Sequence, residues 1–118
     1  MMDTNVKGLI YVSRTVLPFM VEQNSGHVLN IGSTAGAGAY AKGAVYCASK
    51  AAVKTISDGM RIDLIATDVK VTNVQPGITE TDFSKVRFHG DAAKAAKVYE
   101  GIEALQAEDI ANAVVYCT

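Results

Sequence analysis

A short apolar run, a glycine-rich loop and a long amphipathic segment follow one another in this chain, and they limit the folds open to it. Residues 28–31 form the apolar run, which ends in Gly32–Ser33, and residues 35–43 are mostly small. Residues 45–67 carry apolar side chains at helical spacing, at Ala48, Ala52, Val53, Ile56, Met60 and Leu64. Residues 70–74 form a second short run. This order of short apolar run, long helical pattern and second short run predicts two parallel strands of an α/β sheet, joined by a helical crossover.

Further helices are expected on both sides of this unit. Residues 3–23 read as one helix, although Pro18 removes a hydrogen bond there and predicts a bend near Leu17, followed by a last turn. Residues 81–101 read as a polar helical segment, and residues 110–118 end the chain in a helical pattern.

Tyr46 and Lys50 are the candidates for acid/base chemistry. They lie four residues apart on the predicted helix and therefore share a face, so the ammonium can favour the ionised form of the phenol. Ser33 stands at the carboxyl end of the preceding strand, where open α/β sheets bind their ligands. Taken alone, the pair is also typical of an amphipathic tyrosine beside a solvated lysine.

Several motifs in a fixed order carry a resemblance to a family. The order of Asn5, Gly32-Ser33, Tyr46-x-x-x-Lys50, Asn73-x-x-Pro76-Gly77 and Thr81 resembles the short-chain dehydrogenases/reductases, along essentially the whole chain. Residues 81–91, 97–101 and 108–111 resemble the branch that acts on 3-hydroxy acids such as serine and 3-hydroxypropionate with NADP. The resemblance implies hydride transfer between NAD(P) and a secondary alcohol or ketone, with NADP the expected cofactor and NAD not excluded.

The resemblance also implies roles for the catalytic residues. Tyr46 would be the general acid/base, and Lys50 would lower the pKa of the phenol and hold the nicotinamide ribose. Ser33 would donate a hydrogen bond to the substrate oxygen, and Asn5 would anchor a water in a proton relay behind the lysine and so contribute to the cofactor site. Without the family pattern, Asn5 could equally be a helix-start or surface residue, and Ser33 a simple cap.

For the cofactor and substrate, the resemblance points to the second half of the chain. Pro76 and Gly77 match the turn beside the nicotinamide, and the spacing to Thr81 selects its hydroxyl, in preference to that of Thr79, as the cofactor contact. Thr79 would then only begin the following helix, and Pro76–Gly77 alone is an ordinary turn signal. Residues 81–101 would form a mobile lid or a solvated surface helix. Arg87 there could pair with a substrate carboxylate or simply be solvated.

One expected motif is missing. No glycine-rich dinucleotide turn precedes Asn5, and Gly32, Gly36 and Gly38 fit the phosphate spacing poorly, so they are interpreted as loop glycines around the substrate. Residues 1–118 are therefore expected to form a single partial domain, the catalytic half of a doubly wound parallel-sheet, Rossmann-like fold. It would lack the N-terminal dinucleotide-binding strands and the last strand.

A second hypothesis follows from that loss. The chain as it stands could catalyse nothing and at most self-associate through its long helices. In the family these helices pack against a partner subunit, and small Gly59 and Ala66 would permit close approach. A homo-oligomer, dimer or tetramer, is expected for the complete protein.

Composition narrows the remaining function classes. The chain has a net charge of −1 and no run of basic residues. It therefore lacks the positively charged surface that binding to nucleic acid or anionic membranes needs. Cys47 and Cys117 lack metal spacing and suggest a reducing cytoplasm, while His27 and His89 are interpreted as structural or surface residues. We expect a cytoplasmic protein with small-molecule substrates, no metal, no secretion signal and no membrane span.

Overall fold

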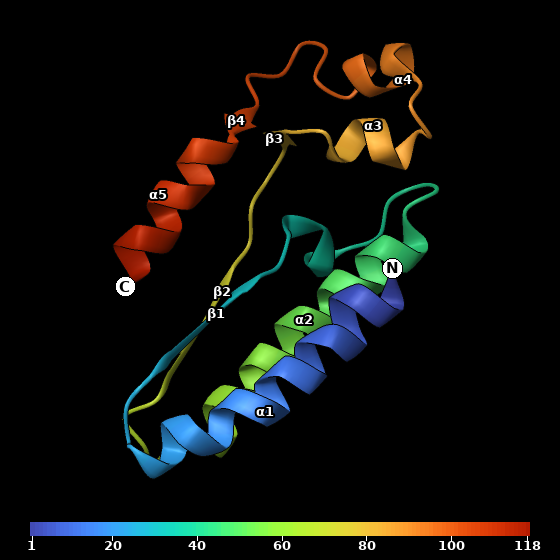
Figure 1. Cartoon of the computed structure of the whole chain (residues 1–118). Helices are drawn as coiled ribbons and strands as arrows, with labels where there is room; N and C mark the ends of the chain where they lie inside the picture. Colours follow the sequence, from blue (N-terminus) through green and yellow to red (C-terminus); the bar gives the residue numbers. More distant parts are fainter. The chain divides into compact units, whose positions relative to one another are not determined.

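Two parallel strands, β1 (His27–Ile31) and β2 (Lys70–Val74), form the sheet of the first part of the molecule (Figure 1). The computed structural model describes residues 1–118, which divide into two units, 1–75 and 76–118. His27 pairs with Lys70 and Ile31 with Val74, and the amide of Gly32 extends the ladder to the carbonyl of Val74 at 2.7 Å. Both predicted strands and their parallel direction are confirmed.

The crossover between the strands is α2 (Ala44–Asp63), which packs on the sheet. The most deeply buried positions of this helix alternate between apolar side chains and serines: Cys47, Ser49, Val53 and Ser57. Asn30 of β1 donates from Nδ2 to the hydroxyl of Ser57 at 2.9 Å, and that hydroxyl donates to the carbonyl of Val53 at 2.7 Å. A paired polar contact therefore lies inside the helix–sheet interface, where the apolar pattern alone would place only carbon.

Helix α2 ends four residues earlier than the predicted boundary at residue 67. Thr67 bonds back to the carbonyl of Leu64 through both its hydroxyl (2.8 Å) and its amide (2.9 Å). A threonine side chain that bonds to nearby backbone competes with the helical hydrogen bond and favours a turn. The chain therefore leaves the helix at Asp63 and turns toward β2.

The first predicted helix consists of two kinds of helix. It opens as a π-helix, η1 (Asp3–Gly8), and continues as α1 (Leu9–Glu22). Pro18 lies inside α1, which continues past it to Glu22, as expected for a last turn. The π-helix was not predicted, because the hydrophobic pattern of six residues does not distinguish π from α geometry. It lies against α2.

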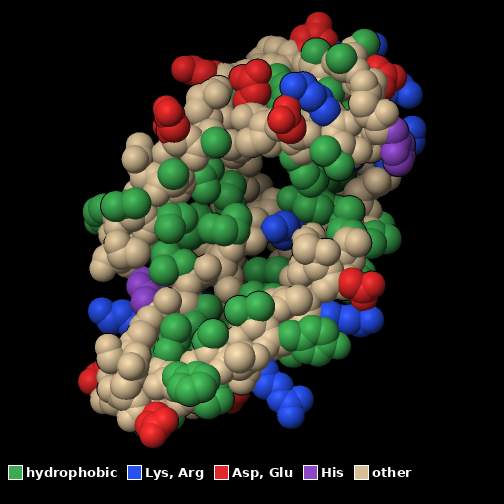
Figure 2. All heavy atoms as spheres, viewed as in Figure 1, with side chains coloured by type: hydrophobic (Ala, Val, Ile, Leu, Met, Phe, Trp, Pro, Cys, Tyr) green, Lys and Arg blue, Asp and Glu red, His purple; other side chains and the backbone are tan.

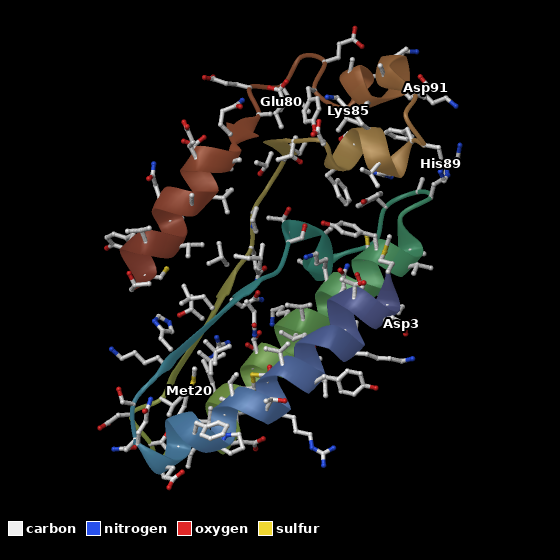
Figure 3. All side chains as sticks on the ribbon, viewed as in Figure 1. Asp3, Met20, Glu80, Lys85, His89 and Asp91 are labelled. Carbon is white, nitrogen blue, oxygen red and sulfur yellow. The ribbon has the colours of Figure 1, made fainter.

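The turn after α1 is closed by side-chain contacts. Asn24, at a positive φ of 49°, donates from Nδ2 to the Asp68 carboxylate and accepts from the Asp68 amide, both at 3.0 Å. Gly26 follows at φ 155°, and a Cβ there would lie 2.6 Å from the Met20 side chain, which Figure 3 labels at the end of α1. These contacts hold the amino-terminal ends of β1 and β2 together.

The second unit contains the short parallel strands β3 (Thr79–Glu80) and β4 (Leu105–Gln106) and the helices α3 (Phe83–Arg87), α4 (Ala92–Lys97) and α5 (Ala107–Cys117). The expectation of a helical segment over residues 81–101 is only partly right. His89 (φ 53°) and Gly90 (φ 86°) break it between α3 and α4, and Figure 3 labels His89 and Asp91 at this turn. The β3–β4 pair was not predicted, because two residues are too few to show an alternating pattern.

The last helix, α5, confirms the helical pattern expected at the end of the chain, and the structure shows where this helix begins. Gln106 and Asp109 form a capping box at the beginning of α5, in which the Gln106 amide donates to Asp109 Oδ2 at 2.7 Å. No helix of the chain is both long and apolar enough to cross a bilayer. The expectation of a single partial domain stays a prediction.

Candidate active site

Lys50 connects α2 with the carboxyl end of β1. Its ammonium donates a hydrogen bond to the main-chain carbonyl of Ile31, with 2.9 Å between Nζ and O, two residues before Ser33. The same Nζ lies 6.0 Å from the ring centroid of Tyr46, within the range of a cation–π contact. Partial burial lowers the pKa of Lys50, because desolvation disfavours the charged form. A cation therefore lies near the phenol ring at the carboxyl end of β1.

Ser33 begins the loop that follows β1. It is the N-cap of η2 (Thr34–Ala37), a 3-10 helix, and its hydroxyl accepts a hydrogen bond from the amide of Ala35 at 3.1 Å. The capping interpretation of Ser33 therefore holds in this structure. A serine hydroxyl keeps a donor and a second acceptor lone pair while it caps, so the role toward a substrate oxygen stays a prediction.

Asn5 lies in the π-helix and connects to the motif that holds Tyr46. Its Nδ2 donates to the hydroxyl of Ser49 at 3.2 Å, and that hydroxyl donates to the main-chain carbonyl of Tyr46 at 2.7 Å. Ser49 is fully buried. The predicted residues Asn5, Tyr46 and Lys50 are thus brought together around α2, with Ser49 between them.

Two of the loop glycines permit close packing beneath this site. A Cβ on Gly36 would lie 2.8 Å from the carbonyl oxygen of Lys50, and a Cβ on Gly32 would lie 2.5 Å from Asn73 Oδ1. The side-chain amide of Asn73 is buried there, and neither its nitrogen nor its oxygen has a hydrogen-bond partner. These glycines are therefore needed where the loop and β2 approach α2 and β1.

Thr81 and its neighbours belong to the second unit and are held by Tyr99. The Tyr99 hydroxyl lies 3.0 Å from the hydroxyl of Ser84, donates toward the carbonyls of Thr79 (3.4 Å) and Thr81 (3.3 Å), and lies 3.4 Å from the Thr81 amide. The Thr81 hydroxyl accepts from the amide of Phe83 at the start of α3 (3.2 Å). The expectation that Thr79 begins this helix is wrong, since Thr79 lies in β3 and donates to Gly77.

The other residues predicted for cofactor and substrate also lie in the second unit. Pro76 and Gly77 precede β3 without regular structure, and a Cβ on Gly77 would meet nothing within 4 Å. Arg87 ends α3, and its guanidinium lies 5.2 Å from the ring centroid of Phe88. The parts that Pro76, Gly77, Thr81 and Arg87 play in a site stay predictions.

The order and geometry of these residues agree with the comparisons to known proteins. A family model described as short chain dehydrogenase matches residues 1–92. The chain belongs to the short-chain dehydrogenases. Its fold is accordingly part of the α/β, Rossmann-like fold of that family, whose members are oxidoreductases. The resemblance inferred from the sequence is confirmed.

Individual relatives cover nearly all of the chain. It is 56% identical over 115 residues to the NADP-dependent 3-hydroxy acid dehydrogenase of Salmonella typhi, covering 97% of this chain and 46% of that protein. It is 43% identical to the NADP-dependent 3-hydroxy acid dehydrogenase of Schizosaccharomyces pombe, covering 98% and 45%. The closed form of serine dehydrogenase complexed with NADP⁺ matches with a TM-score of 0.94 and 53% identity, covering 98% and 47%. The chain thus spans about half the length of the relatives it matches.

Sequence reasoning missed two residues that organise these regions, Ser49 and Tyr99. Ser49 lies inside the Tyr46–Lys50 motif, but a serine within a helix carries no signal of complete burial. Tyr99 lies in a polar segment eighteen residues from Thr81. Both act through hydroxyl groups whose partners are distant in sequence, so only the folded arrangement identifies them.

Proposed function

We propose that this chain supplies the catalytic part of a dehydrogenase that transfers hydride between NADP and a small 3-hydroxy acid. The observation that carries the proposal is the position of Lys50. Its ammonium lies 2.9 Å from the carbonyl of Ile31 at the end of β1 and 6.0 Å from the ring of Tyr46. An acid/base pair and the serine that follows the strand therefore share one edge of the sheet.

Tyr46 is proposed to take the proton from the alcohol during oxidation and to return it during reduction. A phenol ordinarily ionises near pH 10, and a neighbouring ammonium favours the phenolate. Lys50 supplies that ammonium, with its Nζ 6.0 Å from the ring centroid of Tyr46. The cation stays on the helix face that carries Tyr46, so proton transfer occurs next to a fixed positive charge.

Ser33 and Asn5 assist on either side of this pair. Ser33 donates a hydrogen bond to the substrate oxygen, where negative charge develops as the proton leaves. Asn5 binds a water that passes the proton from Lys50 toward solvent. These assignments rest on the family order of the four residues and on the contacts of Asn5 with the Tyr46 motif.

The residues present fit the nicotinamide half of NADP. The ammonium of Lys50 and the hydroxyl of Tyr46 are suited to ribose hydroxyl groups, and Gly36 keeps the loop close to α2. Pro76, Gly77 and Thr81 are proposed to contact the nicotinamide end. When bound, the cofactor supplies the redox step by accepting or donating hydride. The names of the relatives support NADP over NAD.

The substrate class rests on relatives and on one residue. The relatives from Salmonella typhi and Schizosaccharomyces pombe are named 3-hydroxy acid dehydrogenases. Arg87 is proposed to pair with the carboxylate of such a substrate, since a guanidinium binds a carboxylate in bidentate fashion. We also propose a homo-oligomeric, cytoplasmic enzyme for the complete protein.

Exposed apolar residues favour a second candidate function, self-association without catalysis. Tyr11 and Phe19 of α1 are 65% and 68% exposed, and Ile62 of α2 is 71% exposed. Figure 2 shows hydrophobic side chains at the surface of this part of the molecule. A Cβ on Gly59 would meet nothing within 4 Å, so another helix can approach α2 closely there.

Titration of the 118-residue chain with NADPH, followed by nicotinamide fluorescence, tests the proposal. We expect saturable binding of NADPH and NADH alike, because the two share the nicotinamide half that these residues would contact. Binding should be lost in Lys50→Met, while Lys54→Met, at an exposed position one turn away, binds normally. Turnover of 3-hydroxypropionate but not lactate would then identify the 3-hydroxy acid class.

Sedimentation of the same sample separates the two candidates. A folded, monodisperse sample that binds no NADPH contradicts a catalytic role for the chain by itself. A concentration-dependent oligomer without cofactor binding favours self-association, and Ile62→Glu should then dissociate it.

A further inference from the structure

Ser49 forms the contact between the π-helix and the helix that carries Tyr46 and Lys50. It is fully buried, although it lies one residue before Lys50 and three after Tyr46. Its hydroxyl accepts from Asn5 Nδ2 at 3.2 Å and donates to the Tyr46 carbonyl at 2.7 Å. The hydroxyl therefore uses its donor within α2 and one of its two acceptor lone pairs on Asn5, forty-four residues away in the sequence.

The partner on the other side is held in unusual geometry. Asn5 lies in a six-residue π-helix, while its own amide donates to the carbonyl of Met1, four residues back as in an α-helix, at 2.8 Å. Single π-turns are rare and occur frequently at functional sites. Because a π-turn changes the direction of the side chains around the helix, the contact of Asn5 with Ser49 depends on this local geometry.

We propose that Ser49 is a positioning residue for the Tyr46–Lys50 pair. It fixes the first turns of α2 against η1, so that Asn5 stays in register with Lys50 when a proton moves between Tyr46 and solvent. This inference rests on the proposed function. Ser49 itself contacts neither substrate nor cofactor, and it acts through Asn5 and the main chain of Tyr46.

The same helix offers a matched control. Ser57 is also fully buried, and it also accepts from an asparagine amide, that of Asn30, while donating to a main-chain carbonyl of α2. It lies eight residues beyond Ser49, away from Tyr46 and Lys50. Ser49→Ala and Ser57→Ala therefore remove equivalent hydrogen bonds at comparable cost to folding, and only Ser49→Ala affects the acid/base pair.

The variants are compared in a chimeric enzyme. In it, the matching segment of the full-length Salmonella typhi relative is replaced by residues 1–118 of this chain. We expect Ser49→Ala to lower kcat about tenfold, equivalent to about 1.4 kcal/mol of activation free energy, with KM for NADP unchanged. The solvent deuterium isotope effect on kcat should rise, because proton transfer becomes slower. Ser57→Ala should change neither quantity. An equal loss of kcat in both variants, or a loss only in KM, overturns the proposal.

Two further measurements cover the cases in which activity is not informative. Ser49→Cys replaces the hydroxyl by a thiol of similar size, which is a weak donor and acceptor. This variant should fold even if Ser49→Ala does not, and it should still lower kcat. The side-chain amide resonance of Asn5 should shift in Ser49→Ala and Ser49→Cys but not in Ser57→Ala. An unmutated protein without turnover contradicts the proposed function, whereas an unshifted Asn5 resonance contradicts the role of Ser49.

Discussion

The two units of the chain hold their functional residues in different ways. In residues 1–75, Cys47, Val53, Val69 and Val71 form a buried apolar core, and two fully buried serines join α2 to its neighbours. In residues 76–118, Ala95 is the one buried apolar side chain, and the hydroxyl of Tyr99 gathers Thr79, Thr81 and Ser84. Packing therefore fixes the proposed acid/base pair, whereas one hydroxyl group organises the segment proposed to contact cofactor and substrate.

This difference has a consequence for motion. Regions with few buried apolar contacts open at lower free energy than packed cores do. A segment that must admit and release ligands benefits from such low local stability, while a proton-transfer pair needs a fixed geometry. The division of the chain into a packed unit and a loosely packed unit thus matches the roles proposed for their residues.

Tyr46→Phe should have the largest effect, because it removes the acid/base group but little volume. In the chimeric enzyme that carries residues 1–118 in the Salmonella typhi relative, we expect turnover to fall by about 10²- to 10⁴-fold. This is the range typical of general acid/base catalysis. Thermal unfolding should be nearly unchanged. Tyr11→Phe, on the exposed face of α1, is the control and should retain full activity. Substantial turnover of Tyr46→Phe at neutral pH would exclude this residue as the proton donor.

Lys50→Met should separate catalysis from stability in the packed unit. Turnover should fall by about 10² or more, since the cation beside the phenol is lost. Because burial lowers the pKa of Lys50, the unfolded chain binds the proton more tightly than the folded chain does. Stability therefore rises with pH between the lowered pKa and the usual value, and Lys50→Met should lose that rise. Thermal unfolding between neutral and alkaline pH measures this rise, and a variant that keeps the rise contradicts the desolvation of Lys50. A loss of stability at pH 7 would instead report the lost hydrogen bond from Lys50 to Ile31.

Tyr99→Phe should loosen the second unit alone. Removing the hydroxyl takes away the contacts to Ser84 and to the Thr79–Thr81 main chain, a loss of about 1–2 kcal/mol. Hydrogen exchange of the amides in residues 79–84 should become about tenfold faster, which corresponds to about 1.4 kcal/mol. Tyr116→Phe, on the exposed face of α5, should change nothing. Equally faster exchange in β1 and α2 would break the comparison between the units.

Surface ion pairs should have the smallest effect, and it should be the same in both units. A hydrogen bond from Lys54 lowers the pKa of Asp58 in the first unit, and one from Lys85 lowers the pKa of Asp82 in the second. The stability from each aspartate is present above its usual pKa and is lost as pH falls through the lowered value. Asp58→Asn and Asp82→Asn should each reduce the acid sensitivity of unfolding slightly, and a large effect of either would mean that the pair is more than a surface contact.

The sequence by itself determined the parts of this protein that repeat a physical pattern. The apolar runs before Ser33 and Pro76 predicted β1 and β2, and the helical spacing after the loop predicted the crossover α2. The four-residue spacing placed Tyr46 and Lys50 on one face, because helical periodicity is a local property of the backbone. The order of the motifs was sufficient to predict the family.

The tertiary structure decided what depends on partners far away in the sequence. Local sequence patterns do not predict the complete burial of Ser49 and Ser57. Nor do they predict the π-helix around Asn5 or the contacts of Tyr99. The early end of α2 depends on the two hydrogen bonds of Thr67 to Leu64, and the β3–β4 pair on bonds such as that of the Leu105 amide to Ile78. A hydroxyl group can bond locally, to solvent or across the fold with similar free energy, so only the folded chain selects which partner it finds.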